Sequence, residues 1–327
     1  MASAVIPPII FTGLFIALWC WKCTMLVVFQ NTIIYNPFMP PDARSLEIAD
    51  YAGQCRGVTW RKEMIKSLDG TPIALCVSDE VETPPSATPV YILYFQGNAS
   101  SLPPRLPEVS SILRRVRDAD KSASYSVIGV SYRGYWKSHD RPSEKGINLD
   151  IEAALQWVTK LHRNTHADSQ SDPVVLLWGQ SVGCGFASNL AANTTDQSNL
   201  PIRGLVLETP FTNTRAMLQA LYPQKWLPYQ YLWPFLRNHL DTWKNLEMVA
   251  QKSKARPMSV YIVEAGNDEL VPQDHGKMLA ARCEKLGLPV QRYTVRRALH
   301  NDVSIRQAGK QAIADYIRSA VVVAQAK

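Results

Sequence analysis

The chain has 327 residues, of which 46% are hydrophobic and 19% are charged. This composition excludes a disordered chain and a small disulfide scaffold, because it provides enough apolar side chains to bury a core. Lys and Arg total 35 against 28 Asp and Glu, a formal net charge of +7. The basic residues are dispersed and lack the interleaved aromatics of a nucleic-acid platform, so we expect no nucleic-acid partner.

The six cysteines are spread along the chain, at positions 20, 23, 55, 76, 184 and 283. This spacing fits neither a disulfide framework nor a zinc site, and it favours a reducing compartment. Cys20 and Cys23 lie within an apolar run, where they are either S-acylation sites or residues that pack in a membrane.

The N-terminal segment is apolar enough to cross a membrane. Between Val5 and Phe29 the one charged residue is Lys22, and a helix of this length, at about 1.5 Å per residue, exceeds the roughly 30 Å hydrocarbon layer. No Lys or Arg precedes the apolar run, so a retained anchor is favoured over a cleaved signal peptide. We predict a single-pass protein of the endoplasmic reticulum or plasma membrane, anchored by residues 1–30. Lys22 favours a cytosolic body, but one charge decides little.

The remaining sequence alternates strand and helix patterns. Strands are expected over residues 58–61, 73–77, 90–95, 125–131, 174–178, 202–208, 259–264 and 290–295. Helices are expected over residues 106–117, 147–162, 182–192, 273–286 and 304–323. The first two strands suggest an antiparallel start to a sheet. The alternation that follows predicts parallel strands joined by right-handed crossovers, with helices on both faces.

One segment interrupts this alternation. About fifty residues without a strand pattern separate Glu208 from Ser259, and we place a helical insertion at about residues 212–255. It is crowded with aromatic residues and prolines. It is either a helical flap held on the body by its aromatics or a lid whose apolar underside meets an acyl chain or the bilayer surface.

A candidate nucleophile follows the strand over residues 174–178. The sequence there is Gly179-Gln180-Ser181-Val182-Gly183, and a helix of small residues comes next. In a G-x-S-x-G turn between a strand and a helix the serine backbone is strained, its neighbours must be small, and the hydroxyl projects above the sheet. The Val182 N–H then points at the oxygen of an attacked carbonyl. Cys184 is a weak rival nucleophile, since no histidine is assigned to it.

A serine nucleophile requires an acid and a base, which follow it in the chain order Ser, acid, His. Asp268 and His300 come directly after the last two predicted strands, so we expect them to form the triad with Ser181. Glu269 and Asp274 compete with Asp268 but fit solvent-facing or helix-starting positions better. The other histidines are expected to be solvated or to cap helices; they are His139, His162, His166, His239 and His275.

The second oxyanion donor is expected in the loop after the strand over residues 90–95. Gly97 lets the backbone approach a substrate closely, and the Asn98 N–H is the expected donor. An ordinary Gly-Asn turn is the alternative. The supporting residues of the two loops are Gln96, Gly97, Gly179 and Gly183.

These motifs resemble those of the α/β-hydrolases, and the resemblance extends from about Asn36 to the end of the chain. The pattern is similar to a membrane-anchored branch, the fungal bud-emergence family and related abhydrolase-domain proteins, which include lipid and lysophospholipid lipases and protein depalmitoylases. The motifs that carry the resemblance are residues 94–99, 131–138, 179–183, 208–213 and 300–302.

Three residues depart from the pattern of that branch. Gln96 stands where the branch usually has histidine, Trp136 where it has glycine, and Val182 where it has leucine. We expect Gln96 to change how the oxyanion loop is braced and Trp136 to narrow the mouth of the pocket. None of the departures removes a triad member.

The motifs and the resemblance together predict an α/β-hydrolase domain over residues 31–327. The predicted protein is a membrane-tethered serine hydrolase that cleaves esters or thioesters, of fatty acyl groups, through an acyl-enzyme. Its partners are an acyl ester or thioester substrate and the lipid bilayer, and no metal or organic cofactor is required. The alternatives are a non-catalytic membrane scaffold of the same shape and a serine peptidase.

Overall fold

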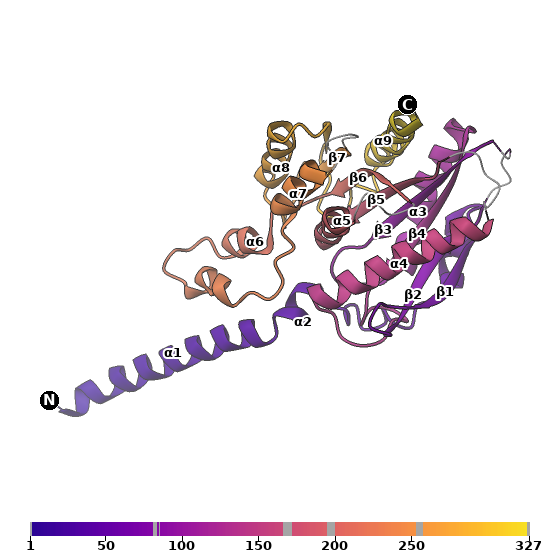
Figure 1. Cartoon of the computed structure of the whole chain (residues 1–327). Coiled ribbons are helices and arrows are strands. Elements are labelled where there is room, and N and C mark those ends of the chain that lie inside the picture. The colour runs from indigo at the N-terminus through magenta and orange to yellow at the C-terminus, as the bar shows by residue number, and fades with distance from the viewer. Residues whose placement is uncertain are drawn as a thin grey trace.

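The computed structural model describes residues 2–80, 84, 86–165, 172–194, 200–252 and 258–325, with the backbone alone for residues 2–4 (Figure 1). The strands are β1 (Trp60–Lys66), β2 (Pro72–Ser78), β3 (Thr88–Phe95), β4 (Ala123–Ser131), β5 (Val174–Gln180), β6 (Ile202–Glu208), β7 (Ser259–Ala265) and β8 (Val290–Val295). They form one sheet in the order β1-β2-β4-β3-β5-β6-β7-β8.

The predicted direction of the strands is confirmed. β2 pairs antiparallel with both β1 and β4, and the remaining neighbours pair parallel. The carboxyl ends of β3, β5, β7 and β8 therefore meet at one edge of the sheet, which is where ligands bind in open α/β sheets.

The first strand is the one whose bounds differ most from the sequence pattern. β1 begins at Trp60 and runs to Lys66, whereas the expected strand covered residues 58–61. Most of β1 is polar and exposed, and it is defined by its pairing with β2 from Trp60 opposite Ser78 to Lys66 opposite Pro72. A hydrophobic pattern does not detect such an edge strand.

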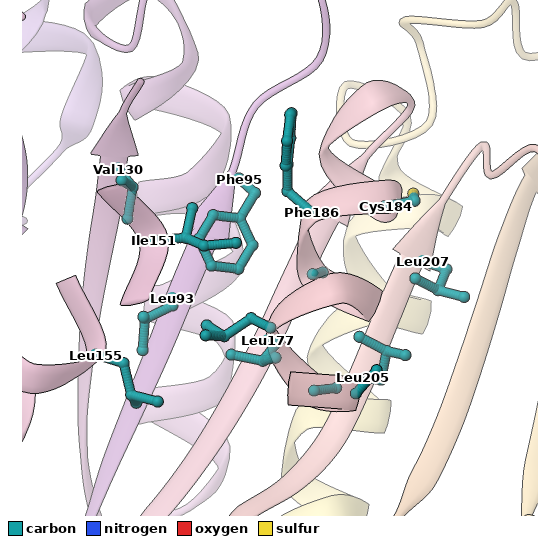
Figure 2. Packing of buried hydrophobic residues seen from close by; sticks show 14 of the residues in the cluster. Leu93, Phe95, Val130, Ile151, Leu155, Leu177, Cys184, Phe186, Leu205 and Leu207 are labelled. Atoms are coloured by element: carbon teal, nitrogen blue, oxygen red, sulfur yellow. The ribbon is translucent and has the colours of Figure 1, made fainter. Parts of the chain in front are cut away.

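Helices cover both faces of the sheet, as predicted. They are α3 (Leu106–Ala119), α4 (Glu144–Thr165), α5 (Val182–Asn193), α7 (Thr242–Lys252), α8 (Asp274–Lys285) and α9 (Gln307–Gln325). One face carries α3, α9 and the 3-10 helix η1 (Ile48–Cys55), and the other carries α4, α5, α7 and α8. Figure 2 shows part of the core on the face that α4, α5, α7 and α8 cover, where Ile151 and Leu155 of α4 lie near Leu93 and Phe95 of β3.

The predicted insertion contains elements with different surroundings. α7 packs on α5 and α8 and buries Leu246 and Val249, so it belongs to the helical layer of the body. α6 (Thr214–Leu221) and the 3-10 helix η3 (Pro228–Phe235) pack against each other, and η3 also contacts the N-terminal helix. The part of the predicted insertion that lies apart from the helical layer of the body is therefore α6 and η3, and we call these two elements the lid after one of the two roles expected of the insertion.

The N-terminal helix α1 (Ala2–Val28) projects away from the body in Figure 1. In the part of the chain that the structure describes, its segment Val5–Val28 is the one that is long and apolar enough to cross a membrane. Residues 5–18 are exposed throughout. The short helix α2 (Gln30–Tyr35) follows and ends with Tyr35, which is fully buried in the body.

A polar cluster connects the end of the N-terminal helix, the predicted anchor, to the chain that follows η3. Gln30 is buried, and its Oε1 accepts a hydrogen bond from the Arg237 N–H at 2.7 Å. Asn238 donates to Asn31 Oδ1 at 2.6 Å and accepts from the Tyr35 hydroxyl at 2.9 Å. We call these five residues the anchor clasp. It makes the start of the body and the base of the lid one hydrogen-bonded unit.

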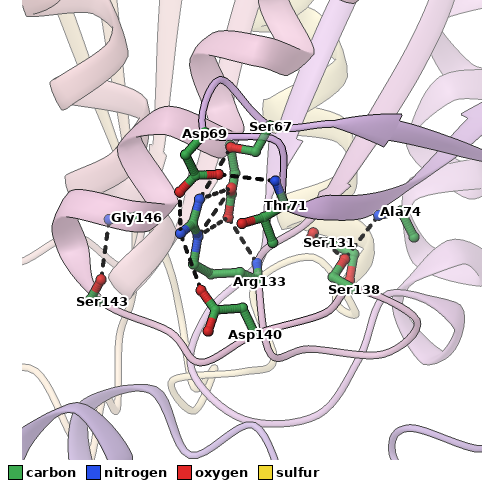
Figure 3. A network of polar contacts seen from close by, with 11 residues as sticks. Ser67, Asp69, Thr71, Ala74, Ser131, Arg133, Ser138, Asp140, Ser143 and Gly146 are labelled. Carbon is green, nitrogen blue, oxygen red and sulfur yellow. Dashed lines mark hydrogen bonds and ion pairs between the residues drawn. The ribbon is translucent and has the colours of Figure 1, made fainter.

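The loop after β4 is held by a buried ion-pair network (Figure 3). The Arg133 guanidinium donates to Asp150 Oδ1 and to Asp69 Oδ2, at 2.8 Å in each case. Asp150 is fully buried, and its carboxylate also accepts the Arg133 backbone N–H at 2.9 Å. The hydrogen bond from Arg133 lowers the pKa of Asp69 below its ordinary value. One arginine thus joins the β1–β2 turn, this loop and α4.

We expect Arg133→Ala to lower the free energy of unfolding by about 3–5 kcal/mol, because it leaves the buried Asp150 carboxylate without its partner. Urea unfolding of the full chain in detergent micelles measures the change. Arg61→Ala is the control. It removes an exposed ion pair to Glu63 at 2.9 Å and should cost less than about 1 kcal/mol. Equal losses in the two variants would contradict a structural role for the buried network.

Candidate active site

Ser181 lies at the turn between β5 and α5. Its backbone angles are φ 51° and ψ −115°, a conformation that is strained for a residue with a side chain. The turn is held by hydrogen bonds from the Ser181 N–H to the Glu208 carbonyl at 2.8 Å and from the Cys184 N–H to the Ser181 carbonyl at 2.9 Å. A strained serine between a strand and a helix is the geometry expected of a nucleophile turn.

Gly179 and Gly183 allow this turn to pack without side chains. A methyl group on Gly183 would overlap the carbonyl oxygen of Phe95, and one on Gly179 would overlap the carbonyl group of Gly183. At Gly97 a methyl group would lie 3.5 Å from Ser181 Cβ, which is ordinary contact. Close packing therefore excludes a side chain at Gly179 and Gly183, whereas there is room for one at Gly97.

Asp268 and His300 are brought together from the loops after β7 and β8. The His300 Nδ1 lies 2.9 Å from Asp268 Oδ2 and 3.0 Å from Oδ1, and both side chains are about 95% buried, with exposures of 4% and 5%. Asp268 Oδ1 also accepts the N–H groups of Leu270 and Val271 at 2.9 and 2.8 Å.

The environment of Asp268 keeps its carboxylate ionised. Burial raises the pKa of Asp268, but the hydrogen bonds from His300 and from the Val271 and Leu270 N–H groups outweigh burial and lower the pKa overall. An ionised carboxylate accepts the hydrogen on Nδ1 of His300, which leaves the lone pair of the neutral ring on Nε2.

Ser181 and His300 line the same cavity, which has a volume of about 310 Å³. Within the described residues, the Ser181 hydroxyl makes no hydrogen bond to His300, and such bonds are often long in the absence of substrate. The polar end of the cavity is lined by Gly97, Asn98, Ser181, Val182, His300 and Asn301. Most of its remaining wall is apolar and comes from the lid and from the end of the anchor.

The two predicted oxyanion donors border this polar end. Across the described ranges, neither the Asn98 N–H nor the Val182 N–H donates to a backbone acceptor outside the regular elements. The loop is braced by the Tyr132 hydroxyl, which donates to the Gln96 carbonyl at 2.8 Å. The buried Gln96 side chain contacts the Ala99 carbonyl at 3.4 Å. In these ranges, no backbone carbonyl competes for either N–H group.

The competing acids and the rival nucleophile make other contacts. Glu269 is exposed, and its carboxylate accepts the His300 backbone N–H at 2.9 Å, so it supports the loop and not the ring. Asp274 is exposed and lies 3.4 Å from Lys277 Nζ. Cys184 is fully buried, and burial raises the pKa of its thiol well above the ordinary value. A buried, protonated thiol is a poor nucleophile.

The expectation that Trp136 narrows the mouth of the pocket is wrong. Its indole is 1% exposed and packs in the core beside α3 and α9. The indole N–H donates to the Leu46 carbonyl at 2.7 Å. The cavity is walled by the core on the opposite face of the sheet, so the indole cannot reach it.

The expectation that His275 is solvated or caps a helix is also wrong. His275 is 7% exposed, and its Nδ1 accepts the backbone N–H of Thr212 at 3.1 Å, which ties α8 to the start of the insertion. Burial lowers the pKa of His275, against the opposing charge of Asp274. His166 lies outside the described residues. Of the others, His139 and His239 are exposed and His162 is half-buried.

A buried acid behind the nucleophile was missed in the sequence. Glu208 is fully buried at the end of β6, and its carboxylate accepts from the Trp178 indole at 3.0 Å and from the Ser304 N–H at 3.2 Å. Burial raises the pKa of Glu208, while its carbonyl holds the Ser181 N–H. In the sequence, the feature that could have revealed Glu208 is an acidic residue at the end of an apolar strand. No group of three metal-binding side chains occurs within the described ranges.

The sheet order, the serine turn after β5 and the acid–imidazole pair beyond β7 and β8 define an α/β protein with a hydrolase-type site. Residues 118–303 match a family described by the alpha/beta hydrolase fold. Because the match takes in more than half of the chain, the protein belongs to the alpha/beta hydrolase fold family.

Individual relatives agree with this assignment. The chain is 27% identical over 226 residues to the protein bem46 of Schizosaccharomyces pombe, covering 69% of this chain and 66% of that protein. It is 32% identical over 197 residues to the lysophosphatidylserine lipase ABHD12 of Gallus gallus, covering 59% and 47%. The chain thus spans about two thirds of the first relative and about half of the second. The predicted resemblance to the bud-emergence and abhydrolase-domain branch is confirmed.

A solved structure agrees with the fold. The alpha-beta hydrolase from Vibrio vulnificus superposes with a TM-score of 0.63 at 19% identity, over 90% of this chain and 92% of that one. At this identity the likeness concerns the fold alone.

We expect Gly183→Ala to lower the free energy of unfolding by roughly 1–3 kcal/mol, because the added methyl group forces the turn away from the Phe95 carbonyl. Denaturant unfolding in micelles measures the change. Gly53→Ala is the control, because a methyl group there would meet nothing within 4 Å, and it should change stability by less than about 0.5 kcal/mol. A Gly183→Ala variant as stable as the control would contradict the close packing of the turn.

The lowered pKa of His275 makes stability depend on pH. The unfolded chain takes up a proton near pH 6.5, whereas the folded chain takes it up at lower pH. The contribution to stability is therefore present above about pH 6.5 and is lost as the pH falls towards the folded pKa. When the pH is lowered from 7.5 to 5.5, we expect the free energy of unfolding of His275→Gln to fall less than that of the wild type. Denaturant titrations at the two pH values measure the change. Replacement of the exposed His239 by Gln should retain the wild-type dependence, and equal slopes in all three proteins would count against the prediction.

Proposed function

We propose that this protein is a membrane-tethered serine hydrolase that cleaves esters or thioesters of fatty acyl groups. One observation carries the proposal: a serine in a strained turn and a histidine paired with a buried aspartate border one apolar cavity. Nucleophile, base and orienting acid are the parts that acyl transfer to a serine requires.

In the proposed reaction, Ser181 Oγ attacks the carbonyl carbon and its proton moves to Nε2 of His300. The negative charge that develops on the carbonyl oxygen is stabilised by the N–H groups of Val182 and Asn98. The alcohol or thiol leaves with the proton from His300, and Ser181 remains acylated. Water then attacks the acyl-enzyme with His300 as its base, which releases the carboxylic acid and the free serine. Asp268 stays ionised and orients the imidazole throughout.

The walls of the cavity support a fatty acyl substrate. Beyond the polar end, the lining includes Met217, Leu218 and Leu221 of α6 and Leu232 of η3. These side chains offer no hydrogen bonds to a polar group, whereas an alkyl chain gains by leaving water. The lipase among the relatives acts on a lipid ester by its name, which agrees with this substrate class.

Membrane tethering is supported by α1 and by the lid. The segment Val5–Val28 has the length and composition of a membrane span. Beside its C-terminal end, η3 and the chain before it expose Trp226, Tyr231 and Phe235, with exposures of 71%, 54% and 60%. Aromatic side chains of this kind are enriched at the membrane–water interface. The lid would then lie at the bilayer surface, with the cavity opening next to it.

We expect Ser181→Ala to lower kcat for p-nitrophenyl butyrate by about 10⁴-fold or more, as in other serine triads. The assay uses the full chain in detergent micelles, with Ser45→Ala as a control at an exposed serine. A Ser181→Ala variant as active as wild type would refute the proposed nucleophile.

Labelling by a fluorophosphonate separates the hydrolase from a non-catalytic scaffold of the same fold. An active enzyme takes up one label, which is lost in Ser181→Ala and kept in Ser45→Ala. A wild-type protein that stays unlabelled and inactive on short esters would favour the scaffold.

A further inference from the structure

The end of the anchor forms part of the wall of the candidate active site. Leu26 and Val27, in the last turn of α1, line the same cavity as Ser181 and His300. Ile33 and Ile34 of α2 line it as well. A helix that served as a tether alone would not need to contribute side chains to the site.

The opposite wall comes from the lid. Met217 and Leu218 of α6 line the cavity together with Phe235 at the end of η3. α1 contacts η3, and the Nζ of Lys22 lies 4.6 Å from the centre of the Tyr229 ring in η3. The apolar lining of the cavity thus draws on two segments that lie about 190 residues apart in the sequence, and on body residues such as Phe211 and Val271.

The anchor clasp fixes this wall in place. Gln30 is 5% exposed and is held on both sides, donating to the Phe235 carbonyl at 3.1 Å and accepting from the Arg237 N–H at 2.7 Å. Arg237 also donates to the Val27 and Val28 carbonyls at 3.1 Å. These bonds satisfy backbone groups at the end of α1 that have no partner within the helix. The position of the helix end is therefore set by specific contacts.

The position of Leu26 along α1 relates the cavity to the bilayer. Leu26 lies two residues before the end of the segment Val5–Val28, at the depth where the hydrocarbon layer gives way to headgroups if the segment spans the membrane. From this depth, Leu26, Val27, Ile33 and Ile34 line the cavity that also contains Ser181, together with the polar Gln30. At about 310 Å³, the cavity is at the lower end of the roughly 300–1,000 Å³ range of small-molecule pockets.

We propose that residues 26–34 are a specificity-determining part of the site. The scissile acyl chain of a membrane lipid enters from the bilayer and lies between Leu26 and Ile34 on one side and Met217 and Leu218 on the other, while its carbonyl reaches Ser181. The rest of the lipid stays outside. This inference rests on the proposed serine hydrolase activity. It adds the route by which the acyl chain enters and the residues that determine which chain lengths are accepted.

A pair of matched substitutions tests the wall. Leu26→Trp fills the cavity, whereas Leu14→Trp makes the same change on the exposed part of α1. We measure kcat/KM of the full chain in micelles for p-nitrophenyl butyrate and p-nitrophenyl palmitate. The palmitate-to-butyrate ratio should fall by about tenfold or more in Leu26→Trp, because shape discrimination in apolar pockets has this size. Leu14→Trp should keep the wild-type ratio, and Leu218→Trp, from the opposite wall, should lower it.

A photoaffinity probe tests the route directly and does not depend on how a variant folds. The probe is a long-chain alkyl fluorophosphonate with a diazirine at the end of the chain, added to wild-type protein in phosphatidylcholine vesicles. Ser181 Oγ forms a bond to phosphorus and fluoride leaves, after which light cross-links the chain end. Mass spectrometry should find the cross-link on residues 26–34 or 217–221, and Ser181→Ala should show none.

The outcomes separate the two proposals. If turnover depends on Ser181 but both Trp variants at positions 14 and 26 have the same ratio, or if the cross-links fall elsewhere, the role of the anchor is refuted and the hydrolase stands. If the wild type shows neither Ser181-dependent turnover nor labelling, the proposed function fails and the inference fails with it.

Discussion

The close packing of the β5–α5 turn is the constraint on which the site depends. Because Gly179 and Gly183 lack side chains, the start of α5 can lie against the carbonyl of Phe95 at the end of β3. The Ser181 N–H reaches across to the Glu208 carbonyl at the end of β6. The turn therefore locks three neighbouring parallel strands at their carboxyl ends. The backbone strain at Ser181 is tolerated because these contacts over-determine its conformation.

The buried acids of the body differ in the donors that surround them. Asp268 has His300 and two backbone N–H groups, and its pKa is lowered overall in spite of burial. Asp150 has the Arg133 guanidinium. Glu208 has two neutral donors, and burial raises its pKa against the opposing charge of Arg105. The raised pKa of Glu208 and the lowered pKa of Asp268 make Asp268 the stronger acid of the two, and it is the one that contacts the imidazole.

Much of the fold and the spacing of the candidate site could be predicted because they follow from local pattern. Buried strands such as β5 are continuous apolar runs, and the residues just beyond parallel strands must meet at one edge, which brings Asp268 to His300. The parts that escaped prediction depend on contacts between distant segments. The indole of Trp136 turns to the face opposite the cavity because Leu46 accepts its hydrogen bond. His275 is buried by the insertion, through Thr212. Gln30 and Asn31, two polar residues at the end of an apolar run, were the overlooked signal for the anchor clasp.

Under the proposed function, a cavity wall shared between the anchor and the site would lower the free-energy cost of bringing an acyl chain from the bilayer to Ser181. Moving an acyl chain from the bilayer through water costs about 0.8 kcal/mol per CH₂ group, so a long chain could not reach a water-exposed serine at a useful rate. In the proposed route, the apolar side chains of Leu26, Val27, Ile33 and Ile34 lower this cost, since the acyl chain exchanges lipid neighbours for leucine, valine, isoleucine and methionine side chains. The Asp268–His300 pair, which is buried, would then carry out the proposed polar chemistry at the other end of this route. Under this proposal, the N-terminal helix would both anchor the protein and supply part of the apolar surroundings of the acyl chain.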